Sequence, residues 1–477
     1  MKIASKENSA VSMVKEALEK AKCCKNYNIF VSLNEEAALN RAKEIDEKIA
    51  RGEPVGRLAG VPYALKDNFL SKEGNTTASA KILEPFHAPI NSTTVEKLEK
   101  EGAIMIGRTN LDAFAHGSST ENSYFGPTLN SYDEERVAGG SSGGSAVAVA
   151  KGIVQFATGT DTGGSIRQPA SFNGVYGFKP TYGTISRYGV VAMASSTDCI
   201  GFFARSAEDI DLLMSICSGQ DSKDLTTLPD YYDESLAQEA LNESASRIGI
   251  IKDFDLTKVD KNVKRVFNEK VEELKRAGHE IVDLSMPALK YALAVYYIIV
   301  PAEVASNLSR YDGVRYGFRS EDAKSLDDVF ALSRGAGFMP ENKRRIMIGN
   351  FVLSSGFYDA YYLKAEKART LIIDEYNKAF EKCDFILAPV SPSPAFKLGE
   401  KVNDPVSMYL EDVMSVPLNL AGVPGLAIPA GETESGLPVG LQIVGPRRSD
   451  KALLKFASTI APEAKVAEAP KNNEEKK

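Results

Sequence analysis

The stretch Gly139-Gly140-Ser141-Ser142-Gly143-Gly144-Ser145 decides how this chain is interpreted, together with Ser165, which follows Ser141 by 24 residues. Between positions 139 and 189 lie 12 of the 37 glycines, about three times the share expected from length. Glycine accumulates where the backbone turns tightly or closely approaches a ligand. Apolar and aromatic residues interrupt the stretch, which disfavours a flexible linker. We therefore expect loops that line a site.

Short apolar runs alternate with helical patterns on both sides of this stretch. Residues 11–21 and 33–49 repeat apolar side chains at helical spacing, and strands are expected at 58–65, 103–107 and 154–158. Farther on, the chain predicts a strand–helix–strand unit over 247–282, a mostly helical insertion at about 285–382, and strands at 385–389, 425–429 and 441–444. This alternation predicts an α/β fold with a central mixed sheet covered by helices.

Composition limits how many domains the chain can form and in which compartment we expect the protein. The 477 residues carry a formal net charge of −7, which argues against strong nucleic-acid binding by the chain itself. Five cysteines without a C-x-x-C pair fit reduced thiols in the cytoplasm. We expect one domain over residues 1–462, with a helical segment at about 1–50, and a disordered charged tail at 463–477. No signal peptide or membrane-spanning run is expected.

Familiar nucleophile and phosphate motifs do not account for the glycine-rich stretch. Ser141 and Ser142 both centre a G-x-S-x-G pattern, but the α/β-hydrolase triad needs a later histidine, and the only one is His279, in a common helix-to-strand turn. Neither phosphate-loop pattern is present, so nucleotide binding is the weaker hypothesis. With three histidines in all, a metal site is not expected. A serine activated by a buried lysine remains, and Lys66 ends an apolar run.

Lys66, the block at 139–145 and Asp161-Thr162-Gly163-Gly164-Ser165-Ile166-Arg167 together closely resemble the amidase signature family. The resemblance extends over about residues 5–460 and implies the amidase-signature fold, with helices on both faces of the sheet. It implies that Ser165 is the nucleophile and that Ser141, on a cis peptide, relays its proton to Lys66. Backbone N–H groups of Thr162, Gly163, Gly164 and Ser165 would then form the oxyanion hole.

The outer segments resemble the A subunits of the tRNA-dependent amidotransferases within that family. The segments are 343–347, 354–362 and 408–425. The resemblance implies glutamine as substrate, with Arg345 for its carboxylate, Asp412 for its amine and Tyr296 as a pocket residue whose role Tyr297 could take instead. It also implies a heterotrimer with B and C subunits, in which ATP, Mg²⁺ and charged tRNA bind mainly at the partner and this chain needs no cofactor. Glu-tRNA(Gln), Asp-tRNA(Asn) or both would be acceptors.

Two rival functions and two departures from the family pattern accompany this interpretation. A stand-alone amidase acting on other small amides would not need Arg345 and Asp412, and a non-catalytic scaffold would not need the three proposed catalytic side chains. Ser131 stands where relatives usually have proline, which concerns a loop. His116 stands where many have methionine; a packed histidine is the main expectation, and a pH effect is the alternative.

Overall fold

The computed structural model describes residues 1–5, 7–229, 232, 246–254 and 256–467. Its strands form a single mixed sheet of 11 strands in the order β1-β3-β2-β4-β6-β5-β10-β11-β9-β7-β8. Parallel pairs join β3, β2 and β4 at one end and β9, β7 and β8 at the other, whereas the pairs between β4 and β9 are antiparallel. The strands are β1 (Phe30–Leu33), β2 (Pro62–Lys66), β3 (Ile104–Thr109), β4 (Phe156–Asp161), β5 (Tyr176–Lys179), β6 (Cys199–Ala204), β7 (Arg247–Ile251), β8 (Glu280–Leu284), β9 (Phe385–Pro389), β10 (Gly425–Glu432) and β11 (Pro438–Val444).

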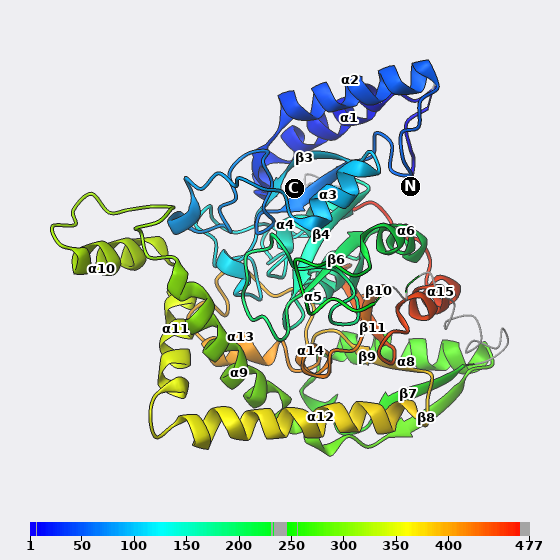
Figure 1. The fold of residues 1–477 in the computed structure, drawn as a ribbon. Helices are drawn as coiled ribbons and strands as arrows, with labels where there is room; N and C mark the ends of the chain where they lie inside the picture. Colours follow the sequence, from blue (N-terminus) through cyan, green and yellow to red (C-terminus); the bar gives the residue numbers. More distant parts are fainter. Residues whose placement is uncertain (6, 230–231, 233–245, 255, 468–477) are drawn as a thin grey trace, which may run out of the picture.

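Helices cover both faces of this sheet, as Figure 1 shows. Side chains of successive strand residues point to opposite faces, and in β2 Tyr63 and Leu65 belong to one core cluster while Ala64 belongs to another. The first cluster includes residues of α3, α6 and α15; the second includes residues of α1, α2 and α4. Their bounds are α1 (Ala10–Cys23), α2 (Glu35–Arg51), α3 (Thr93–Lys100), α4 (Gly143–Ala150), α6 (Ala207–Cys217) and α15 (Asp450–Ile460).

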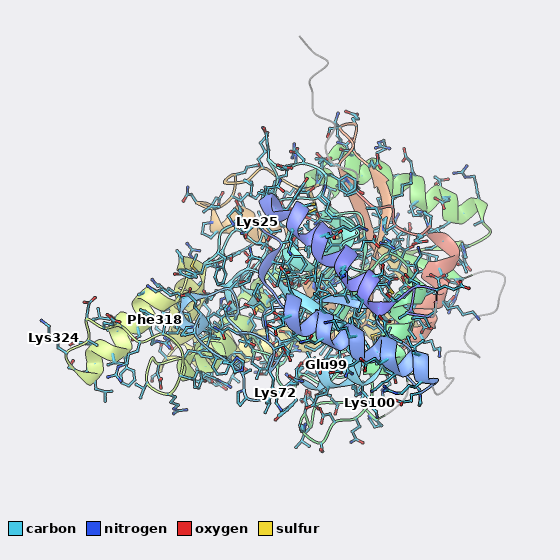
Figure 2. All side chains as sticks on the ribbon, turned by 90° about the horizontal axis from the view of Figure 1, so that it is seen from above. Lys25, Lys72, Glu99, Lys100, Phe318 and Lys324 are labelled. Atoms are coloured by element: carbon cyan, nitrogen blue, oxygen red, sulfur yellow. The ribbon has the colours of Figure 1, made fainter. Side chains whose placement is uncertain are left out.

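A mostly helical segment follows β8 and builds a second packed region beside the sheet. Its helices are α9 (Ala292–Asn307), α10 (Leu326–Gly337), α11 (Pro340–Leu353), a π-helix (Tyr358–Leu363) and α12 (Lys364–Phe380). The remaining α-helices are α5 (Arg167–Phe172), α8 (Lys261–Arg276), α13 (Pro405–Leu410) and α14 (Val416–Ala421). Figure 2 shows that the arm carrying Phe318 and Lys324 stands away from the main body. The helical stretch Pro287–Arg310 has the length and composition of a membrane span. However, 56% of the 18-residue apolar window within this stretch is buried inside the protein, as in a core helix.

The structure confirms the predicted fold class and most of the predicted elements. The short strands β1, β5 and β6 were not expected, because each has only four to six residues and is defined by its pairing with another segment of the chain. Helix α4 begins at Gly143, inside the glycine-rich block. A continuous sheet suits a single domain over 1–462, which stays a prediction. Of the predicted disordered tail at 463–477, residues 468–477 lie outside the described residues, whereas the N–H groups of Ala464 and Ala467 bond the carbonyls of Arg205 and Ala150.

Candidate active site

Lys66 lies at the end of the central strand β2 and is fully buried. Its Nζ lies 2.9 Å from Ser141 Oγ and 2.7 Å from Thr160 Oγ1 on β4. Burial lowers the pKa of Lys66 from its ordinary value to about 7, and the nearby carboxylates of Asp112, Asp161 and Asp198 oppose that shift. An amine with such a pKa is neutral in a large fraction of molecules at neutral pH, so it can accept a proton.

Ser141 is held by a tight loop that precedes α4. The Gly140–Ser141 peptide bond is cis, and the backbone N–H of Asp112 donates to the Ser141 carbonyl at 3.2 Å. The Asp112 carboxylate also accepts from the N–H groups of Thr120 and Asn122, so Asp112 connects the Ser141 loop to the segment at 120–122. A side chain at position 140 would meet Thr120 N at 2.8 Å, which explains the glycine there. Burial raises the pKa of Asp112 to about 7.

Ser165 lies in the turn between β4 and α5, and its carbonyl accepts from Ser142 N–H at 3.2 Å. The turn is shaped by Asp161, whose carboxylate accepts from Gly164 N–H at 2.9 Å and from Ile166 N–H at 3.1 Å. The predicted free N–H at Gly164 is therefore wrong, because this donor is already bound. Among the described residues, no acceptor is found for the N–H groups of Thr162, Gly163 or Ser165.

Arg167 stabilises the same turn through an ion pair with Asp161. Its guanidinium bonds Asp161 Oδ1 at 3.0 Å within a fully buried ion pair and reaches the side chains of Gln442 and Asn419. Burial opposes ionisation of Asp161, but Arg167 and Lys179 hold the pKa of this carboxyl below its ordinary value. Asp161 is therefore an ionised, structural carboxylate, and its orientation fixes the backbone around Ser165.

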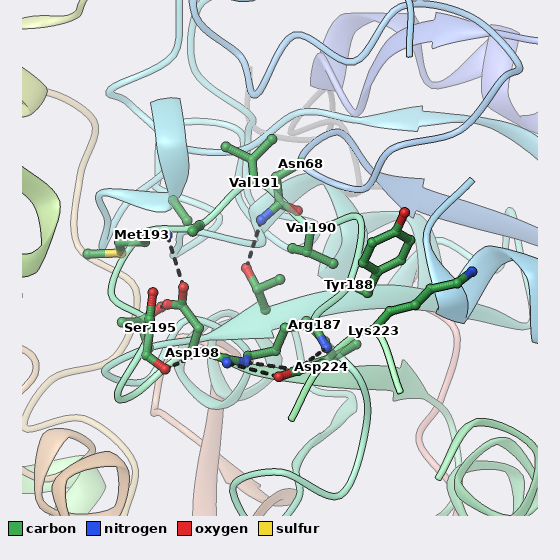
Figure 3. Close-up of a pocket in the computed structure, with 15 residues that line it drawn as sticks. Asn68, Arg187, Tyr188, Val190, Val191, Met193, Ser195, Asp198, Lys223 and Asp224 are labelled. Carbon is green, nitrogen blue, oxygen red and sulfur yellow. Dashed lines mark hydrogen bonds and ion pairs between the residues drawn. The ribbon is translucent and has the colours of Figure 1, made fainter. Parts of the chain in front are cut away.

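A cavity of about 200 Å³ is lined by Thr160 and Thr162, the residues on either side of Asp161 (Figure 3). Asn68 donates to Thr160 Oγ1 at 3.2 Å on one wall, and Asp198 accepts from Thr162 Oγ1 at 2.7 Å on another. Figure 3 shows Asp198 facing Met193, whose N–H donates to it at 2.9 Å. Burial raises the pKa of Asp198 to about 6. Thr160 lines the cavity and also bonds Lys66, so one side chain separates this space from the lysine.

Arg345 and Asp412 lie on either side of the loop at Gly117 and Ser118. Arg345 Nη2 donates to the Gly117 carbonyl at 2.9 Å, and Asp412 Oδ1 accepts from Ser118 Oγ at 2.9 Å. Both side chains are buried, at 2% and 7% exposure. Burial raises the pKa of Asp412 to about 6, while its hydrogen bonds oppose that shift. A cation and a carboxylate so placed can hold the two charged groups of an amino acid.

The two candidate tyrosines, Tyr296 and Tyr297, contact different parts of the candidate site. Tyr297 OH donates to Asp412 Oδ2 at 2.9 Å, and its ring lies 5.4 Å from the Arg345 guanidinium. Tyr296 is buried against the nucleophile turn, because a Cβ at Gly163 would meet its hydroxyl at 2.6 Å. The predicted Tyr296 is thus beside the turn, and Tyr297 contacts the charged pair.

Comparison with known proteins identifies the family. The family model "Amidase" matches residues 12–454. The chain belongs to the amidase family. It is 49% identical over 457 residues to the A subunit of a glutamyl-tRNA(Gln) amidotransferase from Carboxydothermus hydrogenoformans, a match that covers 96% of this chain and 94% of that relative. A solved structure of the Thermotoga maritima protein of the same name is 37% identical, with a TM-score of 0.78 over 98% of this chain and 96% of the other. A peptide amidase from Stenotrophomonas maltophilia, 27% identical, has a TM-score of 0.80 over 96% and 95%.

His116 in this amidase is a packed core residue. It is fully buried, and its Nδ1 contacts the side-chain amide nitrogen of Asn342, which also donates to the Ala113 carbonyl at 2.8 Å. Burial holds the pKa of His116 well below its ordinary value, so the imidazole is neutral. This arrangement agrees with the packed interpretation.

Several residues that organise the site were not predicted from the sequence. Thr160 bonds Lys66, Asp112 supports the Ser141 loop, and Glu341 accepts from Arg345 Nε at 2.8 Å and from Tyr409 OH at 2.7 Å. Glu341 lies four residues before Arg345 on α11, a spacing that favours a helical ion pair and could have indicated it. Among the described residues, no cluster of three or more His, Cys, Asp and Glu could hold a metal ion.

Proposed function

We propose that this chain hydrolyses glutamine and supplies ammonia for the ATP-dependent amidation of misacylated Glu-tRNA(Gln), Asp-tRNA(Asn) or both by a partner subunit. The observation that carries the proposal is the contact between the buried Lys66 amine and Ser141 Oγ. The loop that holds Ser141 is bonded to the turn that holds Ser165, because Ser142 N–H donates to the Ser165 carbonyl. This is the arrangement that activation of a serine without histidine requires. The names of the relatives supply the reaction to which the ammonia goes.

In the proposed mechanism, neutral Lys66 takes a proton from Ser141, which takes the proton of Ser165 as this hydroxyl attacks the carboxamide carbon. The N–H groups of Thr162, Gly163 and Ser165 stabilise the oxyanion, at a gain of about 100-fold or more in rate for a single donor. The same relay returns the proton to the departing nitrogen, so ammonia leaves neutral. Water, activated through the relay, then hydrolyses the acyl-enzyme and releases glutamate.

The substrate pocket is assigned to the pair Arg345 and Asp412. The guanidinium would fork onto the α-carboxylate of glutamine, while Asp412 would bind the α-ammonium. Tyr296 and Tyr297 would close the apolar side of the pocket. Glu341 and Tyr409 hold Arg345 in place, so the cation does not have to be ordered when substrate binds.

The partner assignment is that of a heterotrimer with B and C subunits. ATP and Mg²⁺ would act at the partner, and charged tRNA would bind mainly there. The word "subunit" in the names of the relatives supports an assembly with more than one chain. Five free cysteines in the structure support a reducing location, which we propose to be the cytoplasm.

The test is a glutaminase assay on the purified chain and on its complex with candidate partners, with and without ATP and charged tRNA. Ser165→Ala should abolish ammonia release, whereas Ser145→Ala, in the same glycine-rich block but bonded to Thr109, should retain most of it. Wild-type activity in Ser165→Ala would refute the nucleophile. Equal turnover of unrelated amides, such as peptide amides, would favour the stand-alone alternative suggested by the fold of the peptide amidase.

A further inference from the structure

Two threonines of strand β4 contact Lys66, and only one of them contacts its amine. Strands β2 and β4 are parallel neighbours, with Ala64 opposite Ala157. Residues 158 and 160 project to the same face of the sheet, because side chains alternate along a strand. Thr158 Oγ1 accepts from the backbone N–H of Lys66 at 2.9 Å, whereas Thr160 bonds the side-chain amine. Both threonines are buried.

Among the described residues, three oxygen atoms lie within hydrogen-bond distance of the Lys66 amine. Its Nζ is 2.9 Å from Ser141 Oγ, 2.7 Å from Thr160 Oγ1 and 3.4 Å from the Thr160 carbonyl oxygen. An ammonium group has three N–H donors, so all three oxygens can accept from protonated Lys66. A neutral amine has two N–H donors and one lone pair, so one of these three neighbours must face the lone pair.

The surroundings of Thr160 indicate which neighbour that is. The carbonyl oxygen of Thr160 carries no proton and can only accept. Its hydroxyl oxygen accepts from Asn68 Nδ2 at 3.2 Å, the contact drawn at Asn68 in Figure 3. When this hydroxyl accepts from Lys66 as well, its own proton lies in the remaining direction, away from the amine. The lone pair of Lys66 then faces Ser141 Oγ, whose proton the relay has to move.

We propose that Thr160 is a positioning residue for the relay: its hydroxyl and its carbonyl bind the two N–H groups of neutral Lys66 and direct the lone pair at Ser141. The inference rests on the proposed function. The proton of Ser141 Oγ passes to Lys66 Nζ, and Ser141 Oγ takes the proton of Ser165 in its place. Thr160 exchanges no proton, and the ammonium group that forms donates to both of its oxygens.

The opposite arrangement, in which the Thr160 hydroxyl donates to the lone pair, has the opposite effect on the pKa of Lys66. An accepting hydroxyl stabilises the ammonium form, whereas a donating hydroxyl stabilises the neutral form. The direction in which the pKa moves when the hydroxyl is removed therefore distinguishes the two arrangements. The charged groups that act on the amine stay in place in both, namely the carboxylates of Asp112, Asp161 and Asp198.

The test is Thr160→Val, which replaces the hydroxyl by a methyl group of similar size. The acid limb of kcat/KM should move to lower pH by about one unit or more, because the ammonium form loses an acceptor. The plateau should fall about 10-fold or more, because the lone pair is no longer held in one direction. The substrate is 5-amino-5-oxopentanoate, which lacks the α-ammonium group that Asp412 would bind. Thr160→Ser, which keeps the hydroxyl, should retain the wild-type limb and most of the plateau.

Thr158→Val is the matched control, on the same strand and against the same lysine. Its hydroxyl bonds the backbone of Lys66 and not the amine, so its loss should lower stability without moving the acid limb. Carbon-13 NMR of lysines labelled at Cε measures the pKa of Lys66 without reference to activity, and the signal is identified by its absence in Lys66→Met. If Thr160→Val does not fold, Thr160→Ala removes the same hydroxyl and is measured in the same two ways.

An acid limb and an NMR pKa that stay where they are, or that move to higher pH, on loss of the Thr160 hydroxyl would overturn the proposal. An equal shift in Thr158→Val would overturn it too. A downward shift with a lower plateau, both restored in Thr160→Ser, supports it. The proposed function fails in a different way, through hydrolysis that does not depend on Ser165; the NMR shift then still decides whether Thr160 accepts from the amine.

Discussion

The pH dependence of hydrolysis gives the most direct test of the lysine relay. If the pKa of Lys66 is about 7, half of the molecules carry the neutral amine at pH 7 and about one in a hundred does at pH 5. The kcat/KM value should therefore fall about 50-fold between pH 7 and pH 5 and reach a plateau above about pH 8. A lysine with its ordinary pKa of about 10.4 would be neutral in only about one molecule in 2,500 at pH 7, and the rate would rise up to about pH 10.

Two substrates are needed to separate the pH effect of Lys66 from that of Asp412. The pKa of Asp412 is about 6, so its protonation below that pH also weakens binding of an α-ammonium group. A substrate without that group, 5-amino-5-oxopentanoate, should report the acid limb of Lys66 without the contribution of Asp412. The ratio of kcat/KM for glutamine to that for this analogue should rise with pH through about 6, as Asp412 becomes ionised.

The assay is ammonia release at low substrate concentration between pH 5 and pH 10, with the fold checked by circular dichroism at each pH. A profile for the analogue that keeps rising to pH 10, or one that is flat between pH 5 and pH 7, would refute the assignment of a depressed lysine pKa. An acid limb for glutamine that matches the analogue in every respect would refute the role of Asp412.

Four substitutions test the surroundings of this relay. Asp112→Asn should move the acid limb of kcat/KM to lower pH, because Asp112 raises the pKa of Lys66; a limb that moves upward or stays would contradict this. Gly140→Ala should lower kcat by about 100-fold or more, because the Cβ would displace the Ser141 loop, whereas Gly335→Ala, in open space, should be silent in the same assay. Arg345→Lys should raise KM for glutamine about 10-fold with a smaller effect on kcat, because the charge remains but the fork is lost; an unchanged KM would exclude the carboxylate contact. His116→Met should leave the pH profile of kcat unchanged, because the imidazole is already neutral, and a lost acid limb would show otherwise.

Local pattern in the sequence reached only part of the candidate site. Lys66 became a candidate because it follows a short apolar run, and the glycines around Ser141 indicated a tightly turned loop, but the roles assigned to Ser141 and Ser165 came from the family resemblance. Arg345 and Asp412 could be identified only through resemblance, because each alone is typical of a charged helix surface. The error at Gly164 has a physical cause: the glycine pattern shows that the backbone is tightly turned, but not that Asp161 already accepts its N–H.

Contacts between distant segments explain what the sequence could not reveal. Asp112 supports the Ser141 loop only because the Ser141 carbonyl accepts its N–H across 29 positions, and Tyr297 reaches Asp412 across 115. No local pattern encodes such pairs, since they depend on how loops and helices that are distant in the sequence pack together in the fold. The proposed relay and the proposed substrate-binding pair also lie on different parts of the fold. The residues of the proposed relay come from β2, β4 and the loops beside them, whereas the proposed substrate-binding pair comes from α11 and the segment before α14. Substitutions in the helical part can therefore change which amide is bound while the Lys66 environment, and hence its pKa, is preserved.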